Sequence, residues 1–208
     1  MTENVKPRAA RTRATRRRIV EAAGALFVAD GYTATTLEQI AARAGVAVQT
    51  VYFHFGNKRT LLKEAVDLAV VGDDDPVGIL GRPWLEEAAA ERDPRRVLEL
   101  WTAYGRGILT RIAPIMRVVR DAAVVDPDMA AQWSANMAET ATAFGVLAEQ
   151  LAGLSALRVP VDEAVDVLCA LSGLEMYLVL ADRGWTAERW ESFVVDSLAH
   201  ALLHQGRR

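Results

Sequence analysis

The residues with the most metal-like spacing lie near the C-terminus. His200 and His204 are one helical turn apart, and Asp196 precedes them by another turn. Three such residues on one helix face can bind a metal, but no further acidic or cysteine partner is evident, so we predict no metal site. The sequence also lacks a phosphate-binding loop and a nucleophile motif, and its single cysteine, Cys169, lies in an apolar stretch without a basic neighbour. We therefore expect this protein to have neither an enzymatic activity nor a cofactor.

Arginines near the N-terminus suggest contact with a polyanion instead. Residues 1–70 have a net charge of +5, whereas residues 71–208 have a net charge of −8. Such an asymmetry predicts a nucleic-acid partner for the N-terminal part alone. The basic residues that precede or begin the first helix are Lys6, Arg8, Arg11, Arg13, Arg16, Arg17 and Arg18. They predict phosphate contact or insertion into the minor groove, and a disordered, solubilising tail is the alternative.

The segment from Thr36 to His54, TLEQIAARAGVAVQTVYFH, has the pattern of two short helices joined by a tight turn at Gly45. Thr36 is a candidate N-cap, and Gln39 stands at the capping-box position three residues later. The small Ala41 allows the two helices to approach each other closely. These features are typical of a helix-turn-helix, whose second helix enters the DNA major groove. A generic three-helix unit is the alternative.

The stretch ADGYTATTLEQIAARAGVAVQTVYFHFGNKRTLL, from Ala29 to Leu62, resembles the TetR family of transcriptional regulators. The resemblance is specific over about residues 15–65. It is looser for the C-terminal pair of helices, where LEMYLVLADRGWTAERWESFV is similar to the dimerisation end of the family. The resemblance implies a DNA-binding regulator with a small-molecule effector and a homodimeric assembly.

The resemblance also implies a role for individual residues of the motif. Thr36 would offer its hydroxyl or its helix N-terminus to a DNA phosphate. Thr50 and Tyr52 would donate their hydroxyls to flanking phosphates, and Lys58 would anchor the DNA backbone from the other side. The residues expected to face bases are Val48, Gln49 and Phe53. Glutamine can pair with adenine, and valine or phenylalanine can pack on a thymine methyl group. Tyr52 and Phe53 would be core aromatics in the alternative interpretation.

The elements that must position these residues are helical throughout. Apolar residues recur at spacings of three and four, and no long alternating strand pattern is present. We expect an all-α fold of about nine helices, with helix one at about residues 15–30 and one helix at about 162–182. Pro114 allows a kink or the start of a new helix. The expected organisation is a basic flexible arm at 1–14, a helix-turn-helix DNA-binding domain at 15–70, and a ligand-binding and dimerisation domain at 71–208.

Apolar stripes in the C-terminal domain form either a dense core or a ligand pocket. The resemblance favours a pocket for a small apolar or amphipathic molecule. Tyr104, Trp133 and Thr140 bring polar groups to otherwise apolar stripes and are the candidates for orienting such a ligand. The predicted ligand-binding residues are Trp101, Tyr104, Trp133, Met137, Thr140 and Phe144.

Residues 162–204 have more apolar side chains than two terminal helices need. The first helix is lined by Val165, Leu168, Cys169, Ser172, Met176 and Val179, and the second by Trp190, Phe193, Val194, Ser197, Leu198 and Ala201. Pairing these faces with their copies would form a four-helix bundle across a two-fold axis. In the alternative, the two helices only cover the core of their own chain.

The composition is that of a folded protein, with 51% hydrophobic and 25% charged residues. One cysteine excludes an internal disulfide, and neither a signal peptide nor an apolar run long enough to span a membrane is evident, so we expect a cytoplasmic protein without a membrane partner. The function predicted is a ligand-responsive repressor released from a double-stranded DNA operator. A transcriptional activator or a ligand-free DNA-binding protein of the same fold is the alternative.

Overall fold

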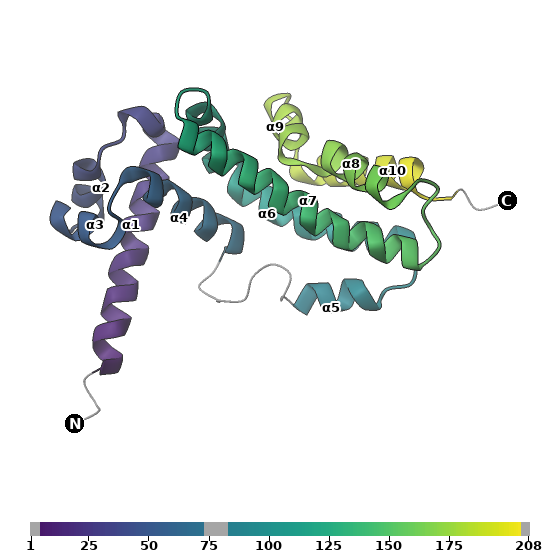
Figure 1. Cartoon of the computed structure of the whole chain (residues 1–208), viewed down its shortest axis with the longest axis horizontal. Helices are drawn as coiled ribbons and strands as arrows, with labels where there is room; N and C mark the ends of the chain where they lie inside the picture. Colours follow the sequence, from purple (N-terminus) through teal and green to yellow (C-terminus); the bar gives the residue numbers. More distant parts are fainter. Residues whose placement is uncertain (1–4, 73–82, 205–208) are drawn as a thin grey trace. The chain divides into compact units, whose positions relative to one another are not determined.

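The computed structural model describes residues 5–72 and 83–204, and these residues are almost entirely helical (Figure 1). The helices are α1 (Val5–Ala34), α2 (Leu37–Ala44), α3 (Val48–Phe55), α4 (Lys58–Val71), α5 (Pro83–Ala90), α6 (Pro94–Ala123), α7 (Pro127–Gly153), α8 (Val161–Ser172), α9 (Leu174–Asp182) and α10 (Ala187–Leu202). One isolated bridge joins Leu157 to Leu203. The all-α fold class predicted from the sequence is confirmed.

The chain forms two compact units. The first contains residues 1–73 and 114–133, and the second contains residues 74–113 and 134–208. α6 and α7 each contribute to both units, because their connected ends, at residues 114–133, group with the N-terminal helices. The expected domain boundary near residue 70 divides the chain by sequence position alone. Packing instead groups the α6–α7 corner with the N-terminal helices.

The core of the first unit is made by one apolar face from each of its N-terminal helices. Ile19, Ala23 and Phe27 of α1 are fully buried, as the predicted stripe on helix one required. The partners from the following helices include Ile40, Val51, Leu61 and Leu62, all at most 1% exposed. This core fixes the angles between α1, α2, α3 and α4.

α1 begins at Val5, about ten residues earlier than expected. Residues 5–14, predicted to be a flexible arm, are helical in this structure. Alanine and arginine, which dominate this stretch, are strong helix formers, and this preference explains the extension. At the other end, Gly31 has φ 80° and ψ 168°, so the regular helix is interrupted where the sequence predicted its end.

Two differences from the expected helices lie in the C-terminal half. α6 continues through Pro114, so the proline does not start a new helix. The predicted helix at 162–182 is instead broken at Gly173, whose φ of −70° and ψ of 164° are extended. A Cβ added at Gly173 would lie 2.3 Å from the carbonyl oxygen of Cys169, so this break requires glycine.

The second unit has its own core, in which α7, α8, α9 and α10 bury large apolar side chains. The fully buried residues there include Leu147, Leu151, Leu168, Leu178 and Trp190. Ion pairs join α6 to α10 at the surface. The Arg106 guanidinium contacts Glu188 at 3.1 Å and Glu191 at 2.5 Å, and Arg95 contacts Asp196 at 2.6 Å.

Candidate nucleic-acid interface

The exposed face of α3 is the strongest candidate for a DNA-reading surface. Phe53 is 84% exposed and Tyr52 is 50% exposed, although both are large and apolar or aromatic. Gln49 is also exposed, and Val48 and Thr50 are partly buried. The opposite face of α3 is buried in the core of the unit and holds the helix in place. A short helix that presents aromatic and amide groups to solvent is suited to contact base edges in a major groove.

Local signals in the sequence position this helix. The Thr36 hydroxyl oxygen accepts a hydrogen bond from the Gln39 backbone N–H at 3.2 Å, and the Gln39 side chain accepts one from the Thr36 N–H at 2.8 Å. The predicted capping box is therefore present at the start of α2. Gly45 has φ 66° and ψ 41°, the left-handed conformation that turns the chain toward α3. Thr36 is exposed beside this helix N-terminus, where a phosphate would meet backbone N–H groups.

Arg16 connects α1 to the end of α3 and to α4. Its guanidinium donates to the carbonyl oxygen of His54 at 3.0 Å, forms an ion pair with Glu64, and lies 4.5 Å from the centre of the Phe55 ring. Arg16 is among the basic residues expected to contact DNA phosphates. In this structure it instead holds the C-terminal end of α3 against the unit, so its present role is structural.

Lys58, like Arg16, is bonded within its own chain. Its ammonium donates to the carbonyl oxygens of Tyr32 at 2.6 Å, Thr35 at 2.9 Å and Thr33 at 3.4 Å. It also lies 4.4 Å from the centre of the Tyr32 ring, and burial lowers the pKa of the ammonium. All three N–H protons thus have acceptors on the segment after Gly31. A phosphate contact by Lys58, as predicted from the resemblance, would compete with these bonds.

The remaining basic residues of the N-terminal segment lie along α1. Arg11, Arg13 and Arg18 are exposed, and Arg17 forms an ion pair with Glu21 at 2.7 Å. Lys6 and Arg8 are in the helical part of the chain. The exposed arginines are therefore displayed on a helix and not on an extended arm.

Arg59, which sequence analysis did not single out, joins α4 to the α6–α7 corner. Its guanidinium contacts Asp126 at 3.1 Å and Asp128 at 2.6 Å. Burial raises the pKa of Asp126. Hydrogen bonds from Arg59 and from backbone N–H groups have the larger, opposite effect, so the pKa of Asp126 is lowered overall. No local pattern marks this contact, because its partners are 67 residues or more apart in the sequence.

The predicted ligand-binding residues fall into three groups. Trp101 and Tyr104 belong to one aromatic cluster with Trp84, an α5 residue that sequence analysis missed. Met137, Thr140 and Phe144 lie on one partly buried face of α7, where the Thr140 hydroxyl donates to the Asn136 carbonyl oxygen at 3.0 Å. Trp133 belongs to the first compact unit, so the structure does not group it with the others.

The structure buries some of the side chains predicted for dimerisation and leaves others partly or fully exposed. Leu168, Trp190, Val194 and Leu198 are buried in their own chain. The alternative, that these helices cover the chain's own core, therefore holds for them. Val179 and Phe193 remain exposed, and the residues that are partly buried are Val165, Cys169, Ser172, Met176, Ser197 and Ala201.

Val161–Asp182 is long and apolar enough to qualify as a candidate membrane span, with a mean hydropathy of 1.8, although the sequence suggested none. A single segment of this kind is weak evidence, because the core helix of a soluble protein can pass the same test. Only a third of its apolar window is buried within the chain. This segment therefore has apolar surface that its own chain does not cover.

Comparison with known proteins gives a family match for the helix-turn-helix region. Residues 19–65 match the family model described as bacterial regulatory proteins, tetR family. The uncharacterized HTH-type transcriptional regulator TtgW of Pseudomonas putida is 47% identical over 55 residues, which span 26% of this chain and 41% of that relative. The chain thus matches less than half of the length of this relative.

Solved structures extend the likeness to the whole fold. SmeT, the repressor of the multidrug efflux pump SmeDEF of Stenotrophomonas maltophilia, in complex with triclosan, has a TM-score of 0.69 and 23% identity, covering 93% of both chains. NalD of Pseudomonas aeruginosa, the secondary repressor of the MexAB-OprM multidrug efflux pump, has a TM-score of 0.67 and 23% identity, covering 92% of this chain and 98% of NalD. Residues 19–65, which contain the helix-turn-helix described above, thus match the DNA-binding region of the tetR family of bacterial regulatory proteins, and the whole chain shares the fold of these solved structures.

Proposed function

We propose that this protein is a homodimeric repressor that binds an operator through α3 and leaves it when a small molecule binds the C-terminal domain. The observation on which this rests is the exposed face of α3, where Phe53 is 84% exposed on a helix held rigidly by its other side. An exposed phenylalanine of this kind is best explained by a partner surface.

On DNA, Gln49, Val48 and Phe53 would contact base edges, and Tyr52 and Thr50 would donate to phosphates. Thr36 would bind a phosphate at the N-terminus of α2. These roles follow from exposure and from the resemblance. The exposed arginines of α1 would add phosphate contacts independent of sequence.

A homodimer through residues 162–204 would cover the apolar surface that remains open. Val179 and Phe193 are exposed, and most of the apolar window in Val161–Asp182 is unburied. A two-fold partner would remove this surface from water and place two copies of α3 in successive major grooves, about 34–36 Å apart or a multiple of this. A dimer of this kind explains the apolar segment without a membrane and agrees with a cytoplasmic protein.

An effector in the C-terminal domain is supported by unpartnered polar groups. Within residues 5–72 and 83–204, no hydrogen-bond acceptor meets the buried indole N–H groups of Trp84 and Trp101, and Trp101 is only 8% exposed. Buried donors of this kind are rare in folded proteins, and an acceptor on a ligand would satisfy them. Tyr104, stacked on Trp84 with ring centres 3.9 Å apart, would add an aromatic wall. SmeT bound to triclosan offers a precedent for a small molecule on this fold.

The DNA-binding part is tested by selecting bound sequences from a random DNA library with the purified protein and measuring affinities for the selected site. Gln49→Ala should weaken binding by about 1–3 kcal/mol and relax preference at one base position. Phe53→Ala should weaken binding while leaving the free energy of unfolding within about 0.5 kcal/mol of wild type, because the side chain is exposed.

Val124→Ala is the matched control for Phe53→Ala, because Val124 is 83% exposed and lies outside α3. It should change neither DNA affinity nor stability. If Phe53→Ala and Gln49→Ala both bind the selected DNA as wild type does, α3 is not the reading helix.

A further inference from the structure

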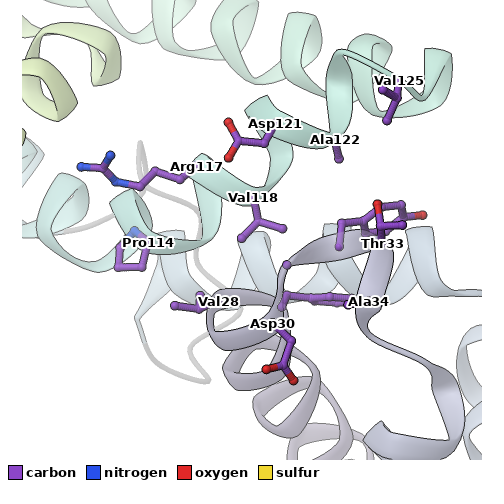
Figure 2. A pocket seen from close by; sticks show the side chains of 13 residues that line it. Val28, Asp30, Thr33, Ala34, Pro114, Arg117, Val118, Asp121, Ala122 and Val125 are labelled. Atoms are coloured by element: carbon purple, nitrogen blue, oxygen red, sulfur yellow. The ribbon is translucent and has the colours of Figure 1, made fainter.

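A hollow of about 720 Å³ lies within the first unit, between the C-terminal end of α1 and the second half of α6 (Figure 2). This volume is within the range of about 300–1,000 Å³ that is usual for small-molecule sites. None of the residues predicted to bind DNA or the effector lines it. The hollow is therefore separate from both proposed sites, and we refer to it as the α1–α6 hollow.

The walls of the α1–α6 hollow combine apolar side chains with a smaller polar share. Val28 of α1 and Val118 of α6 line it from its two sides (Figure 2), and Phe27 and Tyr32 are also among the lining residues. Val28 is 48% exposed and Val125, in the turn after α6, is 74% exposed. Exposed apolar side chains gathered around a concave surface favour binding of an apolar group.

The charges around the α1–α6 hollow favour a positive ligand. Asp30 and Asp121 line it together with one basic residue, Arg117, and Arg120 lies 3.4 Å from Asp121 just outside the lining. Both walls are also C-terminal parts of helices, where backbone carbonyl groups give a partial negative charge. The ammonium of Lys58, bonded to three carbonyl oxygens after Gly31, illustrates that this end of α1 attracts a cation.

We propose that the α1–α6 hollow binds a small amphipathic cation. The apolar or aromatic body of the ligand would lie between Val28 and Val118, and its positive group would lie near Asp30 and Asp121. This site does not depend on an effector in the C-terminal domain, and the two could be occupied independently.

A ligand in this hollow would act on the DNA-binding helices over a short path. The segment that forms one wall, residues 30–34, is held by Lys58 at the start of α4 and leads directly to Thr36, the N-cap of α2. A ligand that fits one spacing of α1 and α6 would favour the arrangement of α2 and α3 that accompanies it. Any effect on DNA affinity must then be matched by an equal effect of DNA on ligand affinity.

The test uses thioflavin T, an aromatic cation whose fluorescence increases when it is held rigidly, titrated with the full-length protein without DNA. We expect saturable binding with Kd in the micromolar range. Val28→Trp, which fills the hollow, should weaken binding at least about tenfold. Val124→Trp is the matched control, because Val124 is exposed close by in sequence to Val125 but does not line the hollow.

Charge is tested separately with the double variant Asp30→Asn and Asp121→Asn. It should weaken thioflavin T binding about three- to tenfold at low salt and less at high salt, because exposed charges are screened. The anion anilinonaphthalene sulfonate should bind wild type more weakly than thioflavin T. Circular dichroism verifies that each variant is folded.

Two outcomes would overturn the proposal: no binding of thioflavin T up to about 1 mM, or unchanged binding by Val28→Trp. If binding is unchanged in Val28→Trp but lost in Tyr104→Ala, the dye is assigned to the C-terminal domain. Because DNA is absent from the titration, none of these outcomes bears on the proposed operator binding.

Discussion

Among single residues, Lys58 allows the clearest distinction between a DNA contact and a structural contact. Its three hydrogen bonds to backbone carbonyl oxygens join α4 to the end of α1. Lys58→Met keeps most of the aliphatic chain but removes the donors, so we expect a loss of about 1–3 kcal/mol in the free energy of unfolding, measured by urea denaturation.

The same variant also tests the phosphate role predicted from the resemblance. A phosphate contact would reduce the slope of log affinity against log salt by about one, equally for all DNA sequences. We expect lower stability with little change in slope, because the ammonium is already bonded within the chain. A reduced slope at unchanged stability would assign Lys58 to the DNA instead.

At the scale of elements, the break between α8 and α9 depends on one glycine. A Cβ at position 173 would lie 2.3 Å from the Cys169 carbonyl oxygen, so the backbone must shift in Gly173→Ala. We expect a loss of about 1–3 kcal/mol in the free energy of unfolding, because the core residues on both sides, Leu168 and Leu174, must be repositioned.

Gly145 of α7 is the matched control for this substitution. It lies inside a helix, and a Cβ there would meet nothing within 4 Å. Gly145→Ala should therefore stabilise the protein by about 0.5–1 kcal/mol, since alanine is the better helix former. Equal effects of the two substitutions in urea denaturation would contradict the steric account of the break.

At the scale of the whole molecule, the proposed dimer predicts a difference between two similarly exposed side chains. Phe193 on α10 is 39% exposed and Val146 on α7 is 40% exposed. Phe193→Asp would place a charge in the proposed interface, because Phe193 lies within residues 162–204. We expect monomers in equilibrium sedimentation at micromolar concentration and a loss of operator binding.

Val146→Asp should remain dimeric, because it adds the same charge at the same exposure outside the proposed interface. A wild-type protein that is monomeric under these conditions would refute the dimer. If Phe193→Asp remains dimeric, the dimer interface does not lie on this face of α10.

Local features of the sequence determined the start of α2 and the turn that leads into α3. The capping box at Thr36 and the turn at Gly45 were predictable, because each depends on residues within a few positions of one another. Periodicity left Tyr52 and Phe53 open as core aromatics, and only the resemblance implied the exposure that the structure shows.

The tertiary structure decided which charged groups are used within the fold. Lys58 bonds to carbonyl groups 23 to 26 residues away, Arg16 pairs with Glu64 48 residues away, and Arg59 meets Asp126 67 residues away. No periodicity predicts such pairs, because packing brings together segments that are distant in the chain. For the same reason the grouping of residues 114–133 with the N-terminal helices, and the hollow they line with α1, were determined only by the folded structure.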